Sequence, residues 1–224
     1  INKTLKHTIN KEPADWYLGM KISQTISSAG VLTEVVLSQK AYIEQLCKAN
    51  GIDPSRSHAE VRTPCTATKL SKEMCTPEDK VDDAIRAKQR KYRANVGALL
   101  FLCRCTMPCI SFAVGRLGRF SSNSGEAHWK EMQHLFKYLF SVRNMGIRYK
   151  RRGASNVIAA PSAIISSWNR NSSTEFECHV DSDFAGCPDT SRSTSGGLVT
   201  WMGAAICWMS ILQACVTLST AEAE

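Results

Sequence analysis

The charges of this chain are divided unevenly along its length, and this division constrains its fold and partners more than any other feature of the sequence. Residues 1–152 carry 26 lysines and arginines against 13 aspartates and glutamates, a net charge of +13. Residues 153–224 carry 2 and 7 respectively, a net charge of −5. The division predicts two units with different roles, a basic one suited to a polyanion and an acidic one suited to a divalent metal ion.

Composition excludes several classes of protein. Apolar residues make up 43% and charged residues 21% of the chain, so it can bury a core and is not disordered by composition. The longest apolar run, residues 97–103, is far shorter than the roughly 20 residues of a membrane helix, and no signal peptide is visible. The ten cysteines are irregularly spaced, and their one cluster, Cys103, Cys105 and Cys109, lacks the paired spacing of a zinc site. We expect buried free thiols in a reducing compartment.

Apolar periodicity in the basic part predicts a mixture of strands and helices. Alternation over 16–24 and β-branched residues over 31–37 predict a hairpin, followed by a helix over 39–49 that Ser38 caps and Gly51 ends. The remaining expected elements are helices over about 77–104, with a break near Tyr92, and over 110–117 and 126–139, and a short strand over 146–150.

The acidic part reads as β-structure after a linker. Residues 153–171 are rich in small and polar residues, which places a boundary between a first unit over 1–152 and a second over 172–224. Alternation from Phe176 predicts a strand that ends in Asp181-Ser182-Asp183, and two further apolar runs, 196–201 and 205–209, predict a hairpin. Ser219 then begins a helix. The expected class is α/β, with a mostly helical α+β part followed by three antiparallel strands and a helix start.

Two carboxylates at the ends of these elements are candidate metal ligands. An aspartate on a central strand, Asp181, and a glutamate in the first turns of the next helix can converge on one point and hold Mg²⁺. Ser219 and Glu222 form a capping box, so Glu222 has a structural role and Glu224 is the preferred ligand. Asp183 is the weaker candidate, because we expect it past the end of the strand. An Asp-x-Asp pair in a loop is also common in plain turns.

A run of basic residues on a predicted helix is the candidate nucleic-acid contact, although the same charges can also serve solubility alone. It comprises Arg86, Lys88, Arg90, Lys91 and Arg93.

Two further features have structural explanations. The neighbouring pair Asp82 and Asp83 lies in helical surroundings, so we interpret it as a solvated helix face and not as a polymerase aspartate pair. His128 and His134 are isolated, and we expect them on a helix surface or partly buried with satisfied partners.

Several short motifs follow one another along nearly the whole chain. They are Tyr17-Leu18-Gly19-Met20, Ser38-Gln39-Lys40-Ala41-Tyr42-Ile43, Thr63-Pro64, Tyr92-Arg93-Ala94-Asn95-Val96-Gly97, His128-Trp129, Lys137-Tyr138-Leu139, Asp181-Ser182-Asp183-Phe184-Ala185-Gly186, Ser193-Thr194-Ser195-Gly196, Trp208-Met209-Ser210 with Gln213, and Ser219-Thr220-Ala221-Glu222-Ala223-Glu224. In this order they resemble the Pol polyprotein of Ty1/copia retrotransposons, at the end of reverse transcriptase and the start of RNase H.

The resemblance implies Mg²⁺-dependent cleavage of RNA in an RNA–DNA hybrid, with Asp181 and Glu224 as first-strand and first-helix carboxylates. Residues 1–152 would be the thumb or connection side of reverse transcriptase, gripping hybrid backbone by charge and shape. The implied partners are nucleic acid and the remainder of the polyprotein, with no membrane. The implied location is cytoplasmic, in a virus-like particle, or nuclear, and not secreted.

Departures from the family pattern leave a second interpretation open. Where the family has Thr-Arg-Pro-Asp-Ile, this chain has Thr106-Met107-Pro108-Cys109-Ile110, without the arginine and the aspartate. We expect the polymerase aspartates before Ile1 and further RNase H carboxylates beyond Glu224, so the isolated 224 residues should lack both activities. The alternative is a decayed transposon relic that binds nucleic acid without catalysis.

Overall fold

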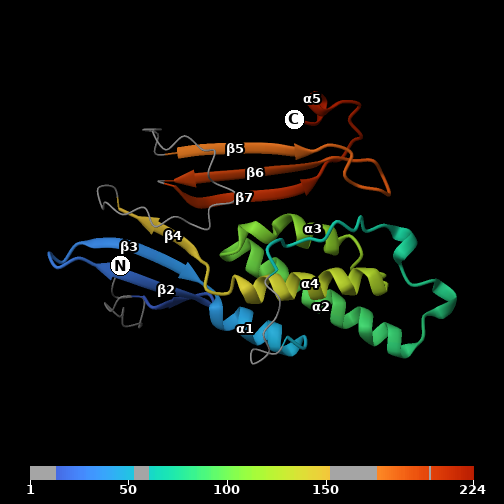
Figure 1. Cartoon of the computed structure of the whole chain (residues 1–224), viewed down its shortest axis with the longest axis horizontal. Coiled ribbons are helices and arrows are strands. Elements are labelled where there is room, and N and C mark those ends of the chain that lie inside the picture. Colours follow the sequence, from blue (N-terminus) through green and yellow to red (C-terminus); the bar gives the residue numbers. More distant parts are fainter. Residues whose placement is uncertain (1–13, 53–60, 152–175, 202) are drawn as a thin grey trace, which may run out of the picture.

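The structure is a computed structural model that describes residues 14–52, 61–151, 176–201 and 203–224. It combines helices with two antiparallel sheets, in agreement with the expected α/β class (Figure 1). The strands are β1 (Trp16–Tyr17), β2 (Met20–Ile26), β3 (Leu32–Ser38), β4 (Ile147–Lys150), β5 (Phe176–Asp183), β6 (Thr194–Trp201) and β7 (Ala204–Leu212). The α-helices are α1 (Lys40–Ala49), α2 (Asp83–Cys105), α3 (Ser111–Gly118), α4 (Glu126–Ser141) and α5 (Thr220–Ala223), and the short 3₁₀ turns are η1 (Lys72–Met74), η2 (Glu78–Lys80) and η3 (Pro108–Ile110).

The first sheet has the order β1-β2-β3-β4, so strands from the beginning and the end of the first part of the chain belong to one sheet. The predicted hairpin forms between β2 and β3, which pair antiparallel. β4 also pairs with β3, with Val36 opposite Arg148. Because β3 precedes α1 and β4 follows α4, this pairing brings together the two ends of the segment that contains the first four helices.

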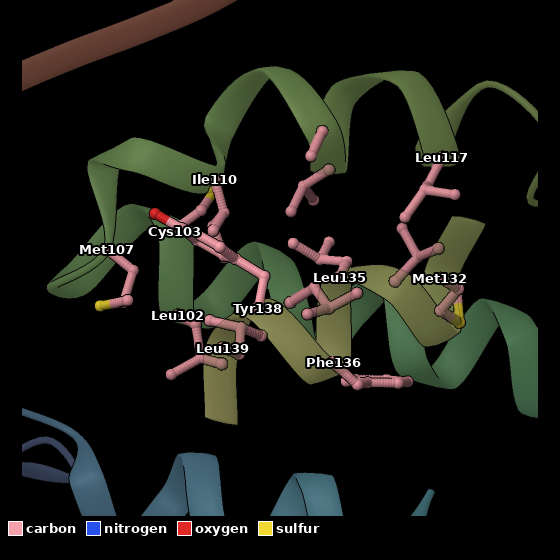
Figure 2. Packing of buried hydrophobic residues seen from close by; sticks show 14 of the residues in the cluster. Leu102, Cys103, Met107, Ile110, Leu117, Met132, Leu135, Phe136, Tyr138 and Leu139 are labelled. Atoms are coloured by element: carbon pink, nitrogen blue, oxygen red, sulfur yellow. The ribbon is translucent and has the colours of Figure 1, made fainter. Parts of the chain in front are cut away.

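The main core lies among α1, α2, α3 and α4. Figure 2 shows side chains of α2, α3, α4 and the connection after α2 converging, among them Leu102, Ile110, Leu117 and Leu135, all fully buried. Ile43 and Cys47 of α1 belong to the same buried cluster. The core also contains buried polar groups, among them the hydroxyl of Tyr92, which donates a 3.0 Å hydrogen bond to the carbonyl of Leu117. This bond fixes α2 against α3.

The second sheet has the order β5-β6-β7 and docks on the helices through β7 (Figure 1). The indole Nε1 of Trp208 donates to the carbonyl of Cys103 at 2.6 Å, and the hydroxyl of Tyr149 donates to the carbonyl of Ala205 at 3.0 Å. β5 is therefore the outer strand, and within the described residues no strand pairs with its free edge.

The expected break in the long helix near Tyr92 is wrong. α2 runs without interruption from Asp83 to Cys105 and begins later than residue 77, because η2 precedes it. Its buried positions, including Tyr92, Val96, Leu99 and Cys103, keep the three- and four-residue spacing of one helix face. The change from charged to apolar composition along α2 therefore marks where the helix becomes buried by other elements, and not where it ends.

At α1 one expectation needs correction and another is confirmed. Ser38 does not cap the first helix: it is the last residue of β3, and Gln39 occupies the N-cap without a side-chain capping bond. The amide of Gln39 is engaged elsewhere, since its Oε1 accepts from the Thr106 hydroxyl at 2.8 Å. Gly51 ends the helix as expected, with a φ of +81° that favours glycine.

All ten cysteines are free thiols, but their burial is only partly as expected. Cys103 is buried, whereas Cys178, Cys207 and Cys215 on or after the strands of the second sheet are exposed. The predicted linker at 153–171 lies outside the described residues. No helix in the part of the chain that the structure describes is both long and apolar enough to cross a membrane.

Candidate functional site

Asp181 lies on the outer strand of the second sheet, two residues before β5 ends. Its side chain is exposed, and its register partner across the sheet is Gly196 on β6. The strand therefore holds the backbone of Asp181 in a regular ladder while its carboxylate faces solvent.

The capping prediction at α5 is confirmed for Ser219, whose hydroxyl accepts from the amide of Glu222 at 3.1 Å. The carboxylate of Glu222 accepts from the amide of Leu218 at 2.7 Å, one residue before the expected amide. Glu222 is thus committed to the start of the helix. The carboxylate of Glu224 is exposed, and no hydrogen bond or ion pair engages it among the described residues.

Gln213 holds the end of α5 beside β6. Its Nε2 donates to the Ser195 hydroxyl at 2.9 Å and to the Ala223 carbonyl at 2.6 Å, and its own amide donates to the Ser193 carbonyl at 2.9 Å. Ser195 is adjacent to Gly196, the partner of Asp181. Two hydrogen bonds at one side chain therefore connect the residue before Glu224 with the strand next to Asp181, and Figure 1 shows α5 and the C-terminus beside the end of β5. The sequence indicates Gln213 only as part of a motif, and its positioning role requires the folded arrangement of two strands and a helix.

Asp183 occupies a different environment from Asp181. The expectation that it lies past the strand is wrong, because β5 extends to Asp183, which pairs with Thr194. Its carboxylate lies against the α-carbon of Gly186, at the position where any larger residue would place its Cβ. Asp183 therefore packs on the turn after β5, which gives it a structural explanation.

Asp181 on β5 and Glu224 after α5 provide oxygen ligands of the kind that Mg²⁺ prefers, and Gln213 ties the end of α5 to β6, the neighbour of β5. Within the described residues, no group of three or more histidine, cysteine, aspartate or glutamate side chains is arranged to hold a metal ion. The donor set thus fits part of a magnesium site, and it would need further ligands.

The five candidate nucleic-acid contacts are all exposed, but they do not share one face of α2. Arg86, Arg90 and Arg93 follow an i, i+4, i+7 spacing and form one stripe, whereas Lys88 and Lys91 lie on other sides. Arg93 donates from Nε to the Ser121 carbonyl at 3.2 Å. We call the three arginines the α2 stripe.

Lys88 instead lines a groove between α2 and α4. Its Nζ lies 2.8 Å from a Glu126 carboxylate oxygen and 5.7 Å from the ring centroid of Trp129. The groove has a volume of about 500 Å³ and also includes Lys130 and Lys137 of α4. Sequence reasoning missed these two lysines, although their seven-residue spacing on an amphipathic helix indicates one exposed face.

The acidic pair at the start of α2 is exposed, as expected for a solvated face, but Asp82 also has a capping role that the sequence interpretation did not include. Asp82 is the N-cap of α2, and its Oδ1 accepts from the amide of Ile85 at 2.7 Å.

Each of the two histidines has a hydrogen-bond partner at one ring nitrogen. His128 is fully buried, and its Nδ1 accepts from the amide of Gly125 at 3.0 Å, which caps α4. Burial lowers the pKa of His128, against the opposing effects of a backbone hydrogen bond at Ser71 and the charge of Asp189. The Nε2 of His134 lies 2.9 Å from the Thr63 carbonyl.

Comparison with known proteins gives three informative matches. The chain is 34% identical over 215 residues to the retrovirus-related Pol polyprotein from transposon TNT 1-94 of Nicotiana tabacum, covering 95% of this chain. It is 31% identical over 134 residues to the Pol polyprotein from transposon RE1 of Arabidopsis thaliana, covering 60% of this chain. It is also 30% identical over 137 residues to secreted RxLR effector protein 161 of Plasmopara viticola, covering 61% of this chain and 83% of that protein.

The chain spans 14% of the length of the tobacco polyprotein and 8% of the Arabidopsis one. No protein-family model and no solved structure matches it.

Proposed function

This chain is a relative of the retrovirus-related Pol polyproteins of copia-type transposons, and we propose that it connects the end of a reverse transcriptase to the start of an RNase H domain. Its sequence is retrotransposon-derived. In this proposal residues 1–152 are the thumb or connection side of the polymerase, and residues 172–224 open an RNase H-like sheet. The tobacco match supports the assignment because it spans 95% of the chain and so includes both parts.

The proposed activity of the whole polyprotein is reverse transcription with cleavage of RNA in RNA–DNA hybrids. Asp181 and Glu224 would hold Mg²⁺, which supplies Lewis-acid stabilisation of the phosphodiester when it is bound. The observation that carries this assignment is the double hydrogen bond of Gln213, which ties the helix end next to Glu224 to the strand beside Asp181. Gln213 is a positioning residue, since it touches neither substrate nor metal in this proposal.

The second candidate is a relic that binds nucleic acid without cleaving it. The observation that favours it is the replacement of the family's arginine and aspartate by Met107 and Cys109. Met107 is buried in the helical core, so its position now serves packing. The name of the Plasmopara protein describes a secreted effector, but that match covers less of this chain than the tobacco match does.

Binding to a short RNA–DNA hybrid tests the nucleic-acid part of the proposal. We expect the wild-type chain to bind with an affinity that falls steeply as salt rises. The R86Q/R90Q/R93Q variant removes the α2 stripe and should reduce the slope of log affinity against log salt by about 0.9 for each phosphate that it no longer neutralises. The control variant K21Q/K48Q/R104Q removes the same charge at exposed positions elsewhere. An equal weakening of binding in the two variants would contradict a specific role for the stripe.

Hybrid cleavage tests the catalytic part. A longer Pol segment that continues beyond Glu224 should cleave the RNA strand with Mg²⁺, and D181N should abolish cleavage. E177Q is the matched control on the same strand, and it should retain most of the activity because Glu177 lies 3.4 Å from His179 Nε2 on β5 itself. Cleavage by the purified 224-residue chain, or equal effects of D181N and E177Q, would contradict the proposal.

A further inference from the structure

A cavity lies at the junction between the helices and the second sheet, separate from Asp181 and Glu224. Its walls come from residues 67–70, from α3 and from the turn after β5, and its volume is about 200 Å³. The functional roles proposed above do not use it. Because its walls belong to both parts of the chain, whatever binds there contacts both at once.

Two arginines at and just after α3, Arg116 and Arg119, line this cavity. Arg116 is held in place: it donates to the Thr68 carbonyl, lies 3.9 Å from a Glu131 carboxylate oxygen, and stands over the Phe112 ring. Arg119 is half-buried, and within the described residues no hydrogen bond or ion pair engages its guanidinium. A partly buried charge without a partner is costly, so Arg119 is set up to receive an anion.

A buried hydroxyl faces the same cavity. Thr194 is only 6% exposed, and its Oγ1 has no hydrogen-bond partner among the described residues. Buried polar groups are nearly always hydrogen-bonded, and each exception needs an explanation. A ligand oxygen in the cavity would supply the missing partner, because a threonine hydroxyl can donate to it.

The charge of the lining favours a single anion. Lys69, Arg116 and Arg119 line the cavity together with one carboxylate, that of Asp183, which lies against Gly186. Since Glu131 also balances Arg116, one positive charge remains in excess. Burial alone would raise the pKa of the neighbouring Cys187 thiol, but hydrogen bonds from Thr190 and the backbone, with the charge of Arg119, lower it overall. The surroundings of Arg119 therefore stabilise negative charge.

From these observations we propose that the cavity binds a phosphate group, with Arg119 and the Thr194 hydroxyl as its principal donors. Guanidinium groups recognise phosphate through their planar fork, and a hydroxyl from another direction suits a tetrahedral oxyanion. The source of the phosphate is the backbone of a bound nucleic-acid strand, a point that rests on the function proposed above. Bound there, the backbone would fix the second sheet relative to α3.

Thermal unfolding with inorganic phosphate tests the site itself. At constant ionic strength, with chloride as the comparison anion, phosphate should raise the melting temperature of the wild-type chain in a concentration-dependent way. R119Q should lose most of this gain, whereas R104Q, at an exposed position on α2, should keep it. An equal gain in R119Q and wild type, or a gain that chloride reproduces, would overturn the site.

The melting temperature of T194V, measured with and without phosphate, distinguishes a ligand-binding hydroxyl from a purely structural one. Removing an unpartnered buried hydroxyl should raise the melting temperature without phosphate and reduce the gain that phosphate adds. A lower melting temperature with an unchanged phosphate gain would overturn the role of Thr194.

Hybrid binding distinguishes the backbone from free phosphate. R119Q should weaken hybrid binding about three- to tenfold and lower its salt slope by about 0.9, the value for one neutralised phosphate. If R119Q loses the phosphate gain but binds hybrid like wild type, the backbone assignment is overturned and the site takes free phosphate. If wild type binds phosphate through Arg119 but binds no hybrid, the function proposed above fails and the phosphate site remains.

Discussion

Replacing Trp208 by phenylalanine should loosen the second sheet from the helices. The indole Nε1 donates to the Cys103 carbonyl at 2.6 Å, near the end of α2. In a regular helix the amide of Met107 would bond that carbonyl, but here it donates to Leu102 at 3.0 Å. The Cys103 carbonyl therefore depends on Trp208, and phenylalanine leaves it without its donor.

The cost follows from this geometry. Leaving a partly buried carbonyl without its hydrogen bond costs about 1–3 kcal/mol. In a chain of this size each kcal/mol lowers the melting temperature by about 2–4 °C, so W208F should melt roughly 2–12 °C below wild type. Differential scanning calorimetry measures this shift. W201F is the matched control, because Trp201 is exposed and stacks on Phe176 at the far end of β6. Equal shifts in W208F and W201F would refute the argument that this bond docks the sheet.

Three further changes test the fold by other means. Y92F removes the buried hydroxyl that donates to Leu117 and should cost about 1 kcal/mol in chemical denaturation; an unchanged midpoint would contradict that bond. Because burial lowers the pKa of His128, the unfolded state is protonated at a higher pH than the folded state, so the free energy of unfolding should fall as the pH drops through about 6.5. H128N should not show this fall, and identical pH dependence of unfolding in H128N and wild type would contradict the prediction. G186A places a Cβ on the Asp183 carboxylate, the end of an exposed side chain that can turn away, so it should cost less than about 1 kcal/mol in thermal unfolding, and D183A should remove this cost; a larger loss that D183A does not rescue would place the strain elsewhere.

Local patterns predicted the elements well where one physical signal dominated. The hairpin of β2 and β3, the glycine after α1 and the cap at Ser219 each depend on residues within a few positions of one another. The change in composition led to a wrong prediction of a helix break near Tyr92, because charged residues indicate exposure to solvent and not the end of a helix. The prediction at Ser38 was also wrong, since a serine before a helix caps it only if the strand before it has ended.

Long-range placement could not be predicted from the chain alone. Nothing near Trp208 in the sequence indicates that its indole meets Cys103, 105 residues away. Helix spacing alone could have shown that the five basic residues of α2 lie on different faces. The groove that Lys88 lines could not be predicted, because it depends on where α4 packs. The two carboxylates were predicted from a pattern, whereas their connection through Gln213 required the positions of three elements.

Paramagnetic broadening by Mn²⁺ tests most directly whether Asp181 and Glu224 belong to one site. Mn²⁺ replaces Mg²⁺ at oxygen ligands, and in nuclear magnetic resonance spectra it broadens signals close to where it binds. We predict selective broadening at both Asp181 and Glu224, lost in D181N and in E224Q and retained in E222Q, whose amide can still accept from Leu218. Broadening at one of the two residues without the other, or at neither, would contradict the account.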